Sequence, residues 1–271
     1  MPVESRDGHQ WQLLARIPPQ PRTAVLWLPA LGVAARHYLP FAEALAARGV
    51  AAFVHEWRGH GSSKLRADNE HDWGYRELLD DDIPASEAAI ALQLPSVERT
   101  LGGHSLGGQL ACCRVAIEPQ AASRLWLVGS GSPYWRAFPL PARFALPLAY
   151  RFLPWLANRH GALPGRRIGF GGAEARGVIT DWAGTARSGR YAGKDIDVDL
   201  EAALATVDVD IRAVLLTGDW YAPASSLQFL LSKMPQANVA VATLDAETLG
   251  IRADHFAWMR QPERVVERLL E

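Results

Sequence analysis

The stretch "GGHSLGGQLACC" (residues 102–113) decides the fold. Its segment Gly103-His104-Ser105-Leu106-Gly107 matches the pattern G-x-S-x-G. Residues 99–105 predict a strand and residues 106–118 a helix, which is the context that a nucleophile elbow requires. The turn between them is so tight that side chains on the flanking residues would collide, and glycine removes the collision. The stretch therefore predicts that Ser105 is a nucleophile at the end of a strand.

The rest of the chain alternates in the same way. Further apolar strands are expected at 23–29, 50–57, 124–131, 211–219 and 238–245, and helices at 36–49, 72–93, 225–234 and 261–271. Near-continuous apolar strands that alternate with helices predict an α/β fold, with a mostly parallel central sheet and helices on both faces. Residues 132–208 break the rhythm. We therefore expect a core of residues 1–131 and 209–271 and a lid (cap) insertion of residues 132–208.

Composition narrows the possible partners. The chain has 271 residues, of which 49% are hydrophobic and 21% charged, as in globular proteins. A net charge of −1 gives no electrostatic reason to expect nucleic acid. The adjacent Cys112 and Cys113 are expected to be buried small residues, and no metal-ligand spacing is present. We expect no metal, no stable membrane insertion and a cytoplasmic location. The oligomeric state stays unknown.

A serine hydroxyl needs a base and an orienting acid. Only His160 and His255 follow Ser105, and His160 lies in the irregular insertion. His255 follows the last predicted strand, so we predict it as the base. Asp219 ends the strand at 211–219 and is the predicted acid. Two other aspartates remain alternatives for the acid: Asp254, which precedes His255 directly, and Asp245, which follows the next strand.

The residues now carry a family resemblance. The chain resembles the α/β hydrolases over nearly its full length and is similar to the serine-aminopeptidase-like and monoacylglycerol-lipase-like branch. Residues 28–63 resemble that branch's oxyanion loop, first helix and D-x-R-G-h-G-x-S turn, with Glu56 where the branch usually has Asp. "LLTGDWYAP" (215–223) resembles its acid loop, and "DHF" (254–256) its histidine loop. Residues 163–184 resemble the lid of a bacterial group of predicted α/β hydrolases.

The resemblance implies an α/β-hydrolase fold with a helical lid and a catalytic triad of Ser105, Asp219 and His255. The backbone amides of Leu31 and Leu106 would form the oxyanion hole, with Pro29-Ala30 in place of the family's His-Gly pair. It implies hydrolysis of a carboxylic ester or thioester through an acyl-enzyme, with no cofactor. An acyltransferase, an amide or carbon–carbon bond hydrolase, and a catalytically silent ligand-binding protein remain alternatives.

The insertion is strongly basic. Between Arg136 and Lys194 the sequence has ten Lys or Arg and two acids, a local charge of +8. One hypothesis is an apolar pocket with a basic mouth for an anionic substrate. The alternative is that these arginines pair with acids of the core, such as those at 80–82.

Aromatic residues are the remaining pocket candidates. His104, Trp220, Tyr221 and Trp155 are candidates for lining the substrate pocket. Trp155, Phe152 and Leu156 could instead form an amphipathic surface, but prolines at 139, 141, 147 and 154 are expected to break that helix repeatedly.

Overall fold

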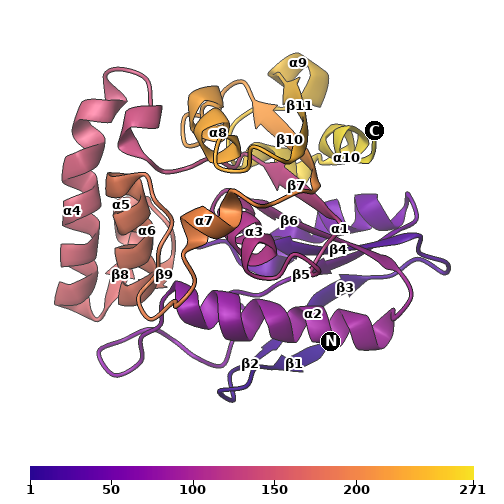
Figure 1. The fold of residues 1–271 in the computed structure, drawn as a ribbon, viewed down its shortest axis with the longest axis horizontal. Coiled ribbons are helices and arrows are strands. Elements are labelled where there is room, and N and C mark those ends of the chain that lie inside the picture. The colour runs from indigo at the N-terminus through magenta and orange to yellow at the C-terminus, as the bar shows by residue number, and fades with distance from the viewer.

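The computed structural model describes residues 1–271 and contains a central seven-stranded sheet. Its strand order is β11-β10-β7-β6-β4-β5-β3 (Figure 1). All neighbours pair in parallel except β3, which pairs antiparallel with β5. The strands are β3 (Leu14–Arg16), β4 (Thr23–Leu28), β5 (Val50–Val54), β6 (Glu98–His104), β7 (Arg124–Val128), β10 (Asp210–Leu216) and β11 (Asn238–Leu244). The predicted mostly parallel sheet is confirmed.

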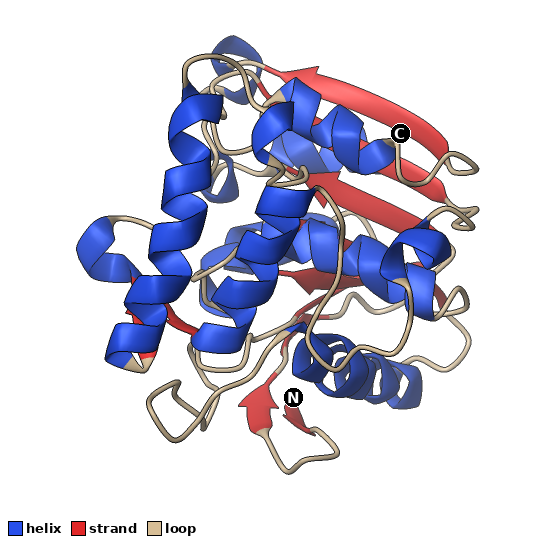
Figure 2. Ribbon diagram, turned by 60° about the vertical axis from the view of Figure 1, so that its left-hand side comes forward, coloured by secondary structure: helices blue, strands red, loops and turns tan.

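Helices pack against the sheet, and the views in Figures 1 and 2 show them around the strands. The helices outside the insertion are α1 (Leu39–Ala46), α2 (Ile83–Gln93), α3 (Leu106–Ile117), α8 (Ala224–Leu231), α9 (Ala246–Leu249) and α10 (Glu263–Leu270), with short 3-10 turns η1 (Ala35–Tyr38) and η4 (Ala257–Arg260). A π-helical segment, η2 (Glu77–Asp82), leads into α2. This widened turn lies directly before Pro84 in the first turn of α2.

The sheet separates two hydrophobic cores. On β4, Leu26 and Leu28 join one core, while Val25 and Trp27 join the other. This alternation follows from the strand geometry, because successive side chains point to opposite faces. Helices α2 and α3 cover the first core, which also includes the buried thiols of Cys112 and Cys113. Helices α1 and α10 cover the second.

The parallel register brings three strand ends to one edge. Strand β6 ends at His104, β10 at Leu216 and β11 at Leu244. Because these strands run in the same direction, the loops that follow them leave from the same edge of the sheet. In open α/β sheets this carboxyl edge is where ligands bind.

Residues 132–208 contain seven elements between β7 and β10. They are η3 (Trp135–Ala137), α4 (Ala142–His160), β8 (Ala162–Pro164), α5 (Gly165–Ile168), β9 (Ala173–Ala175), α6 (Arg176–Ser188) and α7 (Leu200–Leu204). Helix α4 lies beside α6 and the β8–β9 hairpin at one end of the molecule (Figure 1). Helix α7 packs instead against α3 of the core.

The expectation that prolines break the helix near Trp155 is wrong. Helix α4 runs through Pro147 and Pro154 without interruption. Each proline removes one backbone hydrogen bond, but packing can offset that loss. Buried Tyr150, Leu153 and Ala157 anchor one face of α4. The other face remains exposed, and no helix of the protein is long and apolar enough to cross a membrane.

The N-terminal strands had no clear sequence signal. Strands β1 (Pro2–Glu4) and β2 (Gln10–Gln12) form an antiparallel pair, and β3 extends the main sheet at its edge. Each has only three residues, which is too short for a periodic pattern to stand out.

Candidate active site

Ser105 sits at the tight turn between β6 and α3. Its backbone has φ 56° and ψ −119°, a left-handed conformation that non-glycine residues rarely adopt. A Cβ atom on Gly103 would lie 2.2 Å from the carbonyl carbon of Gly107, and one on Gly107 would lie 2.0 Å from the Leu28 oxygen. Strain held in place by such close packing is typical of functional sites.

His255 and Asp219 form a close pair at the same edge. Nδ1 of His255 lies 2.7 Å from Oδ2 of Asp219, and both residues are buried. The other carboxylate oxygen of Asp219 accepts hydrogen bonds from the amides of Tyr221 and Ala222, at 2.9 and 3.1 Å. The carboxylate is thus fixed by its own loop and available to orient the imidazole.

The two alternative acids have other contacts. Asp254 accepts hydrogen bonds from the amides of Phe256 and Ala257, and it pairs with Arg252. Asp245 caps the N-terminus of α9 by accepting from the Thr248 amide. Neither carboxylate forms a hydrogen bond with His255, so the geometry favours Asp219 as its partner.

Ser105 and His255 line the same cavity. No hydrogen bond joins the serine hydroxyl to the imidazole in this structure. Such bonds are often long without substrate and tighten when it binds.

Two unpaired backbone amides lie beside Ser105. The amides of Leu31 and Leu106 have no hydrogen-bond partner within the protein, and both residues line the cavity. Leu106 is the first residue of α3, where the helix dipole favours negative charge. These two residues are the ones that the sequence nominated as oxyanion donors.

A tyrosine that sequence reasoning missed holds the loop next to Leu31. The Ala30 amide donates to the Tyr38 hydroxyl at 2.9 Å, and that hydroxyl lies 2.8 Å from Nδ1 of His104. Because the tyrosine oxygen accepts from Ala30, its proton is free to donate to the imidazole. Burial lowers the pKa of His104 far below its usual value, so this histidine is neutral and accepts that proton.

Glu56 links the far end of this loop, at Ala35, to the turn that contains Ser62. Its carboxylate accepts hydrogen bonds from the amides of Ala35 and Ser62, at 2.9 and 3.0 Å. A Cβ on Gly61 would lie 1.9 Å from the same carboxylate. Glycine at 61 therefore leaves the space that the Glu56 carboxylate occupies.

The cavity has a volume of about 410 Å³ and is mostly apolar. Trp220 and Tyr221 line it, and so do Phe138, Leu146 and Phe152 of the insertion. Two of the nominated pocket residues do not. His104 is completely buried behind Ser105 and contacts Tyr38, and Trp155 is 59% exposed on the outer face of α4. Phe152 lines the cavity, but Trp155, about one turn further along α4, does not.

The insertion's arginines do not pair with the core acids at 80–82, but one of them, Arg176, pairs with Asp72 of the core at 3.6 Å. Asp82 pairs with Arg58 and His9, while Asp81 pairs with Arg6 and Arg76. All four partners belong to the N-terminal part of the chain. The positive charge of the insertion is therefore not neutralised there.

These features define a class of protein. A mostly parallel seven-stranded sheet, a strained serine at a glycine-flanked strand-to-helix turn, and an Asp–His pair from the later strand ends are the architecture of the α/β hydrolases. The chain is an α/β hydrolase. No cluster of three or more His, Cys, Asp or Glu side chains could hold a metal ion.

Comparisons with known proteins give the family. Residues 19–169 match the family described as serine aminopeptidase, S33, which is more than half of the chain, and the protein belongs to that family. The comparison with curated proteins finds no match.

Solved structures share the fold at low sequence identity. An N-formylmaleamic acid deformylase from Pseudomonas putida S16 is 17% identical, with a TM-score of 0.64 over 100% of this chain and 99% of that one. A thermophilic esterase from Thermogutta terrifontis is 18% identical, with a TM-score of 0.65 over 100% and 96%. An enol-lactonase from Burkholderia xenovorans LB400 is 14% identical, with a TM-score of 0.63 over 100% and 98%.

Proposed function

We propose that the protein is a serine hydrolase that cleaves a carboxylic ester or thioester through an acyl-enzyme on Ser105. The observation that carries the proposal is the 2.7 Å pair of His255 and Asp219 on the cavity that Ser105 also lines. A buried carboxylate on Nδ1 leaves Nε2 of the imidazole as the atom that accepts a proton.

The proposed mechanism has two halves. Ser105 attacks the substrate carbonyl carbon while His255 takes the hydroxyl proton and then donates it to the leaving group. The amides of Leu31 and Leu106 stabilise the oxyanion, and loss of one such donor typically raises the barrier by about 3–4 kcal/mol. Water then attacks the acyl-enzyme by the same route and releases the acid.

The insertion supports an acyl-binding role for the cavity. Phe138, Leu146, Phe152 and Leu153 line it from residues 132–208. Apolar lining with few polar groups is usual for small-molecule sites. In this proposal the segment 132–208 acts as a lid that shields an acyl chain from water.

The first prediction tests the nucleophile. Ser105→Ala should lower the turnover of p-nitrophenyl butyrate by at least about 10³-fold and abolish labelling by a fluorophosphonate probe, because the acyl-enzyme cannot form. The thermal unfolding midpoint should stay close to wild type.

A matched control is Ser232→Ala, which removes an exposed hydroxyl that bonds only to the Phe229 carbonyl. It should keep both activity and labelling. Wild-type turnover by the Ser105 variant, or labelling retained in it, would remove Ser105 from the reaction.

A further inference from the structure

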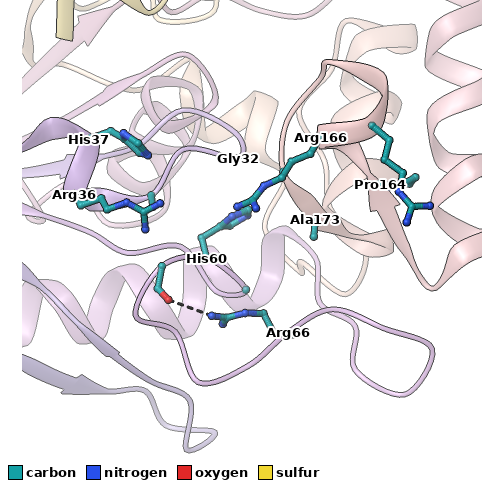
Figure 3. A pocket seen from close by; sticks show the side chains of 13 residues that line it. Gly32, Arg36, His37, His60, Arg66, Pro164, Arg166 and Ala173 are labelled. Carbon is teal, nitrogen blue, oxygen red and sulfur yellow. Dashed lines mark hydrogen bonds between the residues drawn. The ribbon is translucent and has the colours of Figure 1, made fainter. Parts of the chain in front are cut away.

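A second cavity lies beside the active-site cavity and is basic. Its volume is about 410 Å³, and no Asp or Glu lines it. Its charged lining comes from three segments that are distant in sequence. These residues are Arg36, His37, His60, Arg66, Arg166 and Arg167. Figure 3 shows the Arg166 side chain extending across the cavity toward His60, with Arg36 and His37 on the far side. We call this cavity the basic pocket.

The four arginines of the basic pocket have no carboxylate partner. Arg66 donates only to backbone carbonyls, among them that of Gly61, and the other three guanidinium groups form no hydrogen bond within the protein. Arg58 and Arg114, by contrast, are tightly paired with acids. The basic pocket thus concentrates positive charge that the protein does not neutralise.

One buried histidine adds a directed donor. Nε2 of His60 lies 3.1 Å from Glu174, while its Nδ1 has no hydrogen-bond partner and lies on the side of Gly172, which lines the pocket. Burial alone would lower the pKa of His60, but the adjacent Glu174 carboxylate outweighs burial and raises it. A protonated His60 donates from Nδ1 toward the pocket.

Only a thin wall of backbone separates the two cavities. Leu31 lines the active-site cavity and Gly32 the basic pocket; likewise Gly171 lines the first and Gly172 the second. Consecutive Cα atoms are about 3.8 Å apart, so the cavities are immediate neighbours. A Cβ on Gly32 would lie 2.3 Å from the Gly172 nitrogen, so the wall is this thin because glycines pack directly against each other.

We propose that the basic pocket binds an oxyanion group at the distal end of the substrate whose carbonyl reacts at Ser105. This inference rests on the proposed function and adds a substrate class to it: esters or thioesters that carry a phosphate or a carboxylate away from the scissile bond. Guanidinium groups bind both anions through paired hydrogen bonds. Four of them around one cavity match the charge of a phosphorylated end better than that of a single carboxylate.

The test compares two double variants of equal charge. Arg36→Gln/Arg166→Gln removes two guanidinium groups of the basic pocket. Arg151→Gln/Arg159→Gln removes two exposed, unpaired arginines of α4 that line neither cavity. None of these four side chains forms a hydrogen bond or an ion pair within the protein, so both variants are expected to fold.

Matched substrates distinguish the two anions. The phosphate arm compares butyryl-coenzyme A with S-butyryl-N-acetylcysteamine, and the carboxylate arm compares mono-p-nitrophenyl glutarate with its methyl ester. The pocket variant should lose at least tenfold in kcat/KM on the anionic member of one pair and less than twofold on the neutral member. The α4 variant should change less than twofold on all four. Equal losses in the two variants, or no selective loss, would overturn the proposal.

A binding measurement separates this proposal from the proposed function. Titration calorimetry with pyrophosphate should give the same Kd for wild type, Ser105→Ala and the α4 variant, and a Kd at least tenfold weaker for the pocket variant. If this pattern appears while Ser105→Ala keeps full esterase activity, the proposed function fails and the anion site stands. If pyrophosphate binds no more weakly to the pocket variant, the anion site fails whatever the enzyme hydrolyses.

Discussion

At the residue scale, one buried hydroxyl group holds the loop that contains Ala30 and Leu31. Tyr38 accepts from the Ala30 amide and contacts Nδ1 of His104, the residue before Ser105. It therefore joins the loop that carries the Leu31 amide to the strand that carries the serine. No other side chain hydrogen-bonds to both segments.

Removal of that hydroxyl should reduce both stability and turnover. Tyr38→Phe leaves the Ala30 amide and Nδ1 of His104 without partners, and each unsatisfied buried group costs about 1–3 kcal/mol. We expect the free energy of unfolding in urea to fall by at least about 1 kcal/mol. We expect kcat for p-nitrophenyl butyrate to fall about tenfold or more, since oxyanion donors must be held in place.

The control is Tyr134→Phe, because the Tyr134 hydroxyl has no hydrogen-bond partner and its ring packs near Phe229. This variant should stay within about 0.5 kcal/mol of wild type. If Tyr38→Phe also keeps wild-type stability and kcat, Tyr38 does not position the loop.

The sequence allowed Ser105, Asp219 and His255 to be predicted as the triad because each follows a recognisable strand, in a known chain order. The same reasoning missed Tyr38 and the fit of Glu56 to Gly61. Tyr38 and His104 are 66 positions apart, and neither belongs to a motif that names the other. Such contacts depend on how the helices pack against the sheet, and a pattern of residues along the sequence does not determine that packing. Trp155 was misplaced for the same reason, because the buried face of α4 is set by its packing partner.

At the element scale, α3 starts under steric constraints that a second helix lacks. On Gly107 an added Cβ would lie 2.0 Å from the Leu28 oxygen of β4, which cannot move without disturbing the sheet. On Gly184 in α6, an added Cβ would have no atom within 4 Å. The same substitution therefore meets opposite environments in two helices.

We predict opposite signs for alanine at these two positions. Gly107→Ala should lower the free energy of unfolding by about 3 kcal/mol or more, or prevent folding, because overpacking against backbone cannot relax. Gly184→Ala should raise it by about 0.5–1 kcal/mol, the usual helix preference for alanine. Urea denaturation of both variants measures the difference. A stable, fully folded Gly107→Ala protein would show that the elbow has more room than the structure gives it.

The elements themselves were predicted unevenly. The buried strands of the central sheet were all found from their apolar runs, because length and hydrophobicity suffice for a strand buried on both faces. Strands β1 to β3 were missed since each has three residues and mixed polarity. The continuity of α4 was missed because the cost of Pro147 and Pro154 was weighed without the packing of Tyr150 and Leu153 on α6 that offsets it.

At the scale of the whole molecule, stability depends on buried histidines that remain neutral. Burial lowers the pKa of His55 to about 4 and that of His104 far below its usual value. In the unfolded chain both histidines have a pKa of about 6.5. Below that pH the unfolded state binds protons that the folded state does not, so acid favours unfolding at both sites. His60 has the opposite shift, and its contribution is already complete below about pH 6.5.

The free energy of unfolding should therefore fall steadily as the pH is lowered from 6.5 to 5. Each fully buried histidine with a lowered pKa contributes up to about 1.4 kcal/mol per pH unit, so His55 and His104 together should remove about 2 kcal/mol between pH 6 and pH 5. The pKa of His37 is also lowered by burial, but this side chain is exposed and contributes less. Urea denaturation at pH 7.5, 6 and 5 measures the slope of the free energy of unfolding against pH.

His55→Gln should roughly halve this slope, whatever its effect on stability at pH 7.5, because one of the two buried histidines that bind a proton only in the unfolded state is gone. His160→Gln, on the exposed end of α4, should retain the wild-type slope. A slope of zero in the wild type, or the same slope in His55→Gln, would mean that the buried imidazoles take up protons in the folded protein and that the dry core around them opens in mild acid.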